Sequence, residues 1–244
     1  SKAIRALEQL IDSQGNITIT TLESLLGESL LYGYLRRFNN LFTEFFHASV
    51  QVGWAPAAVS SGTVGFGTTT DTDHLGVVQI TSSTTTNSGW YYRSGAAAYI
   101  LSGTEETELV FRLNTTTNTT TQFGFIDTST SAASTDGVWI NIAGTTLDGR
   151  TATSSSSSTT STNYTIVINI WYSIKVVLNS NATLATFYLY SEAGALLWTN
   201  TLATNVPTST ATGNGVICTN SGTSAVNLIE LDYMSVSGSR TLNR

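Results

Sequence analysis

The sequence has very little of several residue types, and each shortage excludes a class of protein. The single cysteine, Cys218, cannot form a disulfide within the chain, and its apolar run GVICT is typical of a small buried side chain. Charged residues make up 11% of the chain and the net charge is −6, which excludes the basic surface of a nucleic-acid-binding protein. No apolar run reaches about 18 residues, so no membrane-spanning helix is expected.

Threonine and serine are abundant instead. The chain contains 43 Thr and 30 Ser, far above ordinary usage. Because threonine suits a pleated, half-solvated surface, this excess favours exposed β-sheet over helix. The N-terminus is polar and shows no secretory signal, so export through a signal peptide is not expected.

Residues 1–53 differ from the rest of the chain and predict a helical segment. A capping box at Thr20–Glu23 precedes leucine and phenylalanine side chains that recur every three or four residues. This stripe packs either on the chain's own β domain, or on copies of itself or another protein. Part of it has the spacing of a coiled-coil seam, which favours self-association as a homotrimer. The predicted oligomerisation residues are Leu31, Leu35, Phe38, Phe42 and Phe45.

Residues 54–244 predict a single all-β domain. Short apolar runs alternate with clusters of Ser, Thr, Gly and Asn, as in sandwiches and jelly rolls. Leu109, Phe111 and Leu113 point to one face of their strand, and the tract 154–162 is expected to be a polar loop. The predicted strands are 75–81, 97–101, 108–113, 122–127, 137–142, 146–153, 165–170, 171–178, 185–190, 195–202, 215–219 and 228–236.

An ordered series of these segments resembles a known fold. HLGVVQITSST, DGVWINI, LDGRTATSS, WYSIKVVL, ATFYLYSEAGALLWTNTLATNVP and LIELDYMSVSG follow one another as in the concanavalin A-like, laminin-G-like jelly roll of many bacteriophage virion proteins. The resemblance covers about residues 54–238. It implies a jelly-roll β-sandwich, preceded by a short α-helical segment that attaches or trimerises it. The fold itself serves lectins, glycosidases and inert structural parts, so it does not choose among these functions.

Two carboxylates near the C-terminus, Glu230 and Asp232, raise the question of catalysis. Residues two apart on a strand lie ~6.5 Å apart, whereas a retaining glycosidase needs carboxyl groups ~5–5.5 Å apart. Met234 stands where a third carboxylate would continue the same face. We therefore expect a structural strand with Tyr233 packed inward and both carboxylates on a polar face, and a non-enzymatic protein. A glycan-active enzyme is the alternative.

Asp71, Asp73 and His74 form the one cluster of acidic residues with a histidine. Two nearby carboxylates and threonine hydroxyls could bind Ca²⁺. The glycine and glutamate of a calcium loop are missing, so turn chemistry is favoured and no metal or other cofactor is expected.

Aromatic residues at Trp90, Tyr91 and Tyr92, followed by Arg93, are the candidate ligand-binding residues. Aromatic rings stack on sugar rings, and a hydroxyl-rich stretch precedes them. The alternative for these residues is core or interface packing. Trp139, Trp171 and Trp198 lie within strand patterns and are expected in the core.

Together with these observations, the resemblance to phage virion proteins implies a non-enzymatic phage virion structural protein made in the host cytoplasm. A tail fibre or receptor-contacting appendage is the favoured location, with possible binding to host surface glycan, and a capsid decoration or head fibre protein is the alternative. A free lectin-like binding protein is a further alternative. The expected partners are the chain itself and other virion proteins, through the N-terminal helix, with no nucleic acid and no membrane.

Overall fold

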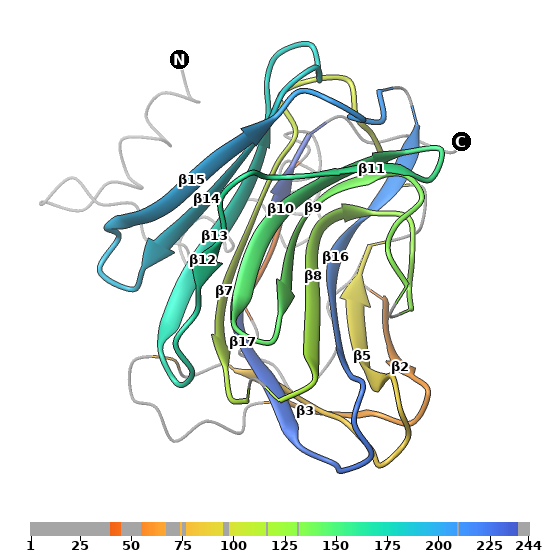
Figure 1. The fold of residues 1–244 in the computed structure, drawn as a ribbon, viewed down its shortest axis with the longest axis vertical. Coiled ribbons are helices and arrows are strands. Elements are labelled where there is room, and N and C mark those ends of the chain that lie inside the picture. Colours follow the sequence, from red (N-terminus) through yellow and green to blue (C-terminus); the bar gives the residue numbers. More distant parts are fainter. Residues whose placement is uncertain are drawn as a thin grey trace, which may run out of the picture. The chain divides into compact units, whose positions relative to one another are not determined.

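The computed structural model describes residues 40–44, 55–66, 74, 77–94, 98–115, 117–130, 132–208 and 210–238, and within these ranges it contains strands and no helix (Figure 1). The chain divides into two compact units at residue 40. The strands are β1 (Asn40–Glu44), β2 (Ala55–Val59), β3 (Thr63–Phe66), β4 (Val78–Thr81), β5 (Ser88–Arg93), β6 (Tyr99–Ile100), β7 (Glu106–Leu113), β8 (Thr119–Ile126), β9 (Gly137–Ala143), β10 (Thr146–Thr153), β11 (Ser156–Thr159), β12 (Tyr164–Thr165), β13 (Trp171–Leu178), β14 (Ala185–Ser191), β15 (Leu196–Leu202), β16 (Ala211–Asn220) and β17 (Asn227–Ser237).

The strands form two antiparallel sheets. An eight-stranded sheet has the order β15-β14-β13-β7-β17-β4-β3, with β1 paired to β17. A nine-stranded sheet has the order β11-β10-β9-β8-β16-β5-β2, with β12 paired to β10 and β6 to β16. This architecture confirms the predicted all-β sandwich of two antiparallel sheets and is consistent with a jelly roll.

The main hydrophobic core lies between the two sheets. Leu109, Phe111 and Leu113 on β7 are fully buried, as their alternation predicts. Gly149 on β10 leaves room for the ring of Phe187 on β14, because a Cβ at this position would lie 2.5 Å from a ring carbon. Cys218 is buried in the same core, which confirms the prediction for this residue.

The serine tract contains a hairpin, so the prediction of a polar loop over 154–162 is wrong for part of it. Strand β11 pairs with β10 from Thr153↔Ser156 to Arg150↔Thr159. Ser154 and Ser155 form the two-residue turn with φ angles of 48° and 67°. Two consecutive positive φ angles are typical of a type I′ hairpin turn. The sequence signal was missed because Asn and Gly, rather than Ser, are the usual residues there.

The predicted strand 165–170 is also wrong, because only Tyr164–Thr165 pair with β10. Asn169 has a φ of 59°, which breaks the extended conformation. Its N–H donates to the carbonyl of Leu113 at 2.8 Å, and the N–H of Val167 donates to the Tyr172 hydroxyl at 3.2 Å. The apolar run is therefore a loop tied to the body of the domain.

Besides β11, the three strands β2, β3 and β5 were not predicted, and β1 lies in a segment that was predicted as helix. The strands β2 and β3 lie at the edges of their sheets. An edge strand tolerates proline, which explains Pro56 in β2. Strand β5 follows a stretch rich in serine and threonine. Asn40–Glu44 is strand β1, so the helical prediction is wrong for these residues. Strand β4 pairs with Asn227–Leu231 of β17, and β1 also pairs with β17. The rest of the predicted helix, including Leu31, Leu35, Phe38 and Phe45, lies outside the described residues, as does the side chain of Phe42.

Candidate functional site

The four predicted ligand-binding residues lie on β5 and alternate between two environments. Trp90 and Tyr92 pack in the core between the sheets, where Tyr92 is fully buried. Tyr91 and Arg93 lie on the outer face of the nine-stranded sheet, which is turned away from the other sheet, and both are partly exposed. The Arg93 guanidinium carbon lies 5.4 Å from the centroid of the Tyr91 ring, a cation–π contact. Tyr91 and Arg93 can therefore reach a ligand on the outer face, whereas Trp90, although also partly exposed, packs against the core.

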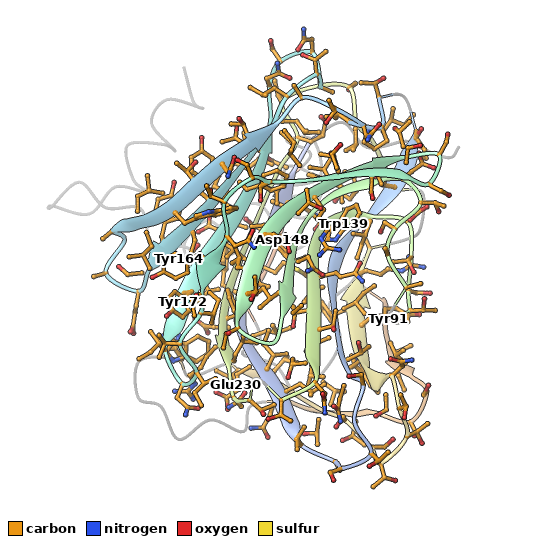
Figure 2. All side chains as sticks on the ribbon, viewed as in Figure 1. Tyr91, Trp139, Asp148, Tyr164, Tyr172 and Glu230 are labelled. Carbon is orange, nitrogen blue, oxygen red and sulfur yellow. The ribbon has the colours of Figure 1, made fainter. Side chains whose placement is uncertain are left out.

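Hydrogen-bonding side chains continue from Tyr91 across the same face. The strand registers place Gln122, Asn141 and Asp148 in one row with Tyr91. Figure 2 labels Tyr91, Trp139 and Asp148 on this sheet. Asp148 is buried and accepts hydrogen bonds from Arg150 Nε at 2.6 Å and Nη2 at 3.1 Å, so its charge is neutralised. The side chain of Arg150 is 33% exposed and retains donors for a ligand.

A loop made of residues 127–130 and 132–136 folds over this face. The carboxylate of Asp127 accepts bonds from the Thr135 N–H at 3.0 Å, the Thr135 hydroxyl at 2.6 Å and the Asp136 N–H at 3.1 Å, which closes the loop. Arg93 Nη1 donates to the Thr128 carbonyl at 2.9 Å, and Gln122 Nε2 donates to the Ala132 carbonyl at 3.1 Å. The loop is thus anchored to the same side chains that line the face.

Trp139 is buried on the outer face rather than between the sheets. It belongs to a small apolar cluster with Ile126, Ile217 and partly buried Tyr91. Within the described part of the chain, its Nε1 and the Ser134 hydroxyl are buried without a hydrogen-bond partner. A buried polar atom left unpaired costs about 1–3 kcal/mol. Trp198 is in the main core, as predicted.

Glu230, one of the two carboxylates considered for catalysis, lies on the outer face of the other sheet. Figure 2 labels it on β17. It is 5% exposed and accepts bonds from Arg112 Nη2 at 2.5 Å and Nε at 2.7 Å, and from Gln79 Nε2 at 3.1 Å. Strand register explains the contact, because Glu230 pairs with both Arg112 and Gln79. The carboxylate is therefore held in a neutralised, fully bonded position.

A β-bulge separates Glu230 from the second carboxylate. Leu231 pairs with Phe111 but Tyr233 pairs with Val110, so Asp232 is an extra residue in β17. The bulge reverses the alternation, which buries Met234 in the core and leaves Tyr233 partly exposed on the outer face. The predictions that Met234 shares the face of Glu230 and that Tyr233 packs inward are therefore wrong.

The carboxylate of Asp232 bonds to His74, which is adjacent in sequence to the possible calcium ligands Asp71 and Asp73. His74 Nδ1 lies 2.8 Å from Asp232, and its Nε2 lies 3.3 Å from Glu192. The His74 ring stacks on Trp171 at 3.9 Å between centroids, and Arg112 lies over the Trp171 ring at 4.8 Å. Trp171 is thus buried on the outer face of the eight-stranded sheet. Glu192 and Asp232 are 118 and 158 residues away from His74 in the sequence, so no local motif could reveal this cluster.

A surface pocket lies between the β7–β8 and β16–β17 connections. It is lined by Thr117, Asn118, Asn220, Gly222, Thr223, Ser224 and Val226. The amide of Asn220 already bonds to Ser82, Ser224 and Gly222, so it mainly holds the turn together. The pocket contains neither a charge nor an aromatic ring.

No group of three or more His, Cys, Asp and Glu side chains in the described ranges could hold a metal ion. Asp71 and Asp73 lie outside those ranges, so calcium binding there stays a prediction. None of the described segments forms a helix able to cross a membrane.

The family model described as "SO2946-like, C-terminal domain" matches residues 73–232, which is more than half of the chain. The solved structure of SO2946 from Shewanella oneidensis MR-1, a protein of unknown function, is 18% identical with a TM-score of 0.70. The match covers 84% of this chain and 88% of that one. No curated protein matches the chain.

Two further solved structures share the fold. Lectin I from Ulex europaeus, in complex with a methyl glycoside of α-L-fucose, is 12% identical with a TM-score of 0.52; 82% of this chain and 98% of the lectin are covered. The CBM2 module of the evolved Dit protein of Lactobacillus casei BL23 phage J-1 is 9% identical with a TM-score of 0.53; 81% of this chain and 96% of the module are covered. At these identities the likeness is one of fold.

Proposed function

We propose that this chain, which belongs to the SO2946-like C-terminal domain family, is a non-enzymatic virion structural protein whose β-sandwich binds host surface glycan. The binding surface is the outer face of the nine-stranded sheet around Tyr91, Arg93 and Arg150. The protein belongs to a tail fibre or a receptor-contacting appendage.

The observation that carries the proposal is the pairing of Tyr91 with Arg93 on this face. A partly exposed aromatic ring offers a stacking surface for a sugar, and the guanidinium offers N–H donors for hydroxyl groups. Arg150 adds further donors on the same face, oriented by its bidentate contact with Asp148. An aromatic surface with a few placed polar groups is the general chemistry of a small-molecule or sugar site.

The environments of Glu230 and Asp232 favour binding over catalysis. A retaining or inverting glycosidase needs one free acid and one free carboxylate at a substrate. Glu230 is instead buried against Arg112, and Asp232 is bonded to His74. Asp148 on the candidate face is likewise paired with Arg150.

The virion location is supported by the resemblance in the sequence and by the fold shared with a phage carbohydrate-binding module. The N-terminal segment would attach the β domain to the particle and trimerise it. Imaging of whole particles with a label on this protein tests the location. Label at the tail or an appendage supports the proposal, and label over the capsid would favour a decoration or head fibre protein.

The binding site is tested with Tyr91→Ala in the full chain, using a panel of bacterial surface polysaccharides. Loss of the stacking ring should weaken binding about tenfold or more. Tyr188→Ala is the matched control, because Tyr188 is a partly exposed tyrosine on the eight-stranded sheet. Equal binding by both variants, with the fold intact, would exclude this face as the glycan site.

A further inference from the structure

Trp139 is buried on the outer face of the nine-stranded sheet beneath small side chains. The residue is 1% exposed and packs with Ile126 and Ile217. The loop over this face, made of residues 127–130 and 132–136, contains only Asp, Thr, Ser and Ala. A fully buried side chain normally touches several other apolar side chains. The described part of the loop has no apolar side chain larger than alanine, so it offers the Trp139 ring no large apolar partner.

Three side-chain polar atoms at this place are buried without a hydrogen-bond partner. They are Nε1 of Trp139, the hydroxyl of Ser134 and Oε1 of Gln122, and each of these residues is at most 4% exposed. A Cβ at Gly137 would lie 3.3 Å from both Cβ of Ser134 and Cε3 of Trp139, so these two side chains adjoin. Gln122 donates to the carbonyl of Ala132, two residues before Ser134. Because buried polar atoms are normally paired, this group of unpaired atoms indicates a ligand site.

The middle of the loop is attached to the sheet more weakly than its two ends. At one end Arg93 donates to the Thr128 carbonyl at 2.9 Å, and at the other the N–H of Ser155 donates to the Thr135 carbonyl at 2.9 Å. Between these ends, the described residues receive a single hydrogen bond from the sheet, which Gln122 donates at 3.1 Å. The other hydrogen bonds there are local to the loop. The middle can therefore lift from the sheet while both ends stay attached.

Two glycines form a floor without side chains between Trp139 and Arg93. Strand register places four residues in one row across β9, β8, β16 and β5, namely Trp139, Gly124, Gly215 and Arg93. Neighbouring strands lie ~4.8 Å apart, so the row spans ~14 Å. A Cβ at Gly124 would lie 2.4 Å from the Val138 carbonyl oxygen. A Cβ at Gly215 would lie 2.4 Å from Cβ of Arg93. A chain-like ligand at Arg93 can thus extend along this floor to Trp139.

The charges and hydrogen-bonding groups at this place fit an uncharged sugar. A sugar hydroxyl both donates and accepts, which suits the indole N–H, the amide oxygen and the hydroxyl that are left unpaired. Asp127 and Asp136 belong to the loop, so an acidic sugar would bring its carboxylate toward two like charges. Of the two arginines on this face, Arg150 is already paired with a carboxylate, and Arg93 lies at the far end of the row from Trp139.

We propose that the loop lifts to admit one uncharged sugar unit of the bound glycan and then closes on it, so that this unit lies between the loop and Trp139. The indole ring stacks on the sugar. Nε1 of Trp139, Oε1 of Gln122 and the hydroxyl of Ser134 bond to its hydroxyl groups. The inference rests on the proposed glycan binding at Tyr91 and Arg93, and adds a second subsite along the same face. The ligand is then a neutral glycan of two or more units.

The indole N–H signals in NMR spectra of the full chain test the subsite directly. The probes are oligosaccharides cut from the neutral and the acidic polysaccharides of the binding panel. The Trp139 signal, identified by its loss in Trp139→Phe, should shift when a neutral probe binds, because this N–H gains a partner. Trp198 is the internal control, because its Nε1 is also buried and unpaired but lies in the main core. A Trp139 signal that stays in place while a probe binds, or binding of acidic probes alone, would overturn the proposal.

Binding and stability of two variants provide a second test. Trp139→Phe and Ser134→Ala should each weaken binding of the neutral probe about fivefold, because each removes one hydrogen bond to the sugar. Ser134→Ala should not lower the stability to urea, since the lost hydroxyl is unpaired in the free protein. Trp198→Phe is the matched control and should bind like wild type. Wild-type affinity in both variants, with Tyr91→Ala still impaired, would overturn the subsite alone. No binding by the wild type would overturn the proposed function and the subsite with it.

Discussion

The buried ion pair between Glu230 and Arg112 leads to a quantitative prediction for stability. Glu230→Gln keeps the shape of the side chain but removes the charge that neutralises Arg112, whose side chain is only 20% exposed. Removing one partner of a buried pair costs about 3–5 kcal/mol, because the other charge is left uncompensated. Since Arg112 retains contact with water and keeps other interactions, including the Trp171 ring, its charge is not left wholly uncompensated, and we expect a loss of about 3 kcal/mol, at the lower end of that range.

The loss is measured by urea unfolding, and the same variant should unfold about 6–12 °C below wild type. Glu106→Gln is the matched control, since Glu106 pairs with Lys175 on the same sheet with side chains 40% and 27% exposed. An exposed pair contributes about 1 kcal/mol or less. If Glu230→Gln costs no more than Glu106→Gln, the pair does not stabilise the sheet as described. Arg112→Met combined with Glu230→Met should cost less than Glu230→Gln alone.

Three further predictions concern other parts of the domain. Burial raises the pKa of Cys218 to about 12, so the folded protein should not react with a thiol reagent at pH 8, and rapid labelling without denaturant would contradict the buried position. Gly149→Ala should lower the free energy of unfolding by about 1–3 kcal/mol, because the new Cβ meets the Phe187 ring; unchanged urea stability would show that the sheets separate easily there. Asp127→Ala should make residues 127–136 cleavable by protease while the sandwich stays folded, since three hydrogen bonds to this carboxylate close the loop; wild-type resistance would disprove that role.

Much of the fold could be predicted because buried strands leave a local pattern. Strand β7 alternates between buried and partly exposed residues, and β13 does the same from Tyr172 onward. The pattern fails where one residue changes the register. Asp232 is an extra residue in β17, and nothing in LIELDYM distinguishes it from its neighbours. It also fails at Val167–Ile170, where an apolar run is kept on the surface by contacts with Leu113 and Tyr172.

The candidate site was predictable only in part. Tyr91 and Arg93 could be selected as an aromatic and a cation beside a hydroxyl-rich stretch. Their position on the opposite face from Trp90 and Tyr92, however, follows only once these residues are known to form a strand. Arg150 and Asp148 were not selected, because a charged pair within a strand is usually a solvated surface. His74 was assigned to a local acidic cluster, whereas its described partners come from β17 and the β14–β15 turn. Such contacts follow from topology rather than from spacing.

Glycan binding at the outer face of the nine-stranded sheet is tested most directly by amide hydrogen exchange. The full chain is compared with and without a bacterial surface polysaccharide selected from the binding panel. Amide exchange should slow in β5 and in residues 127–130 and 132–136, because a glycan on Tyr91 and Arg93 would also restrain the loop that Arg93 contacts. Protection confined to the eight-stranded sheet, or no polysaccharide that binds at all, would contradict it.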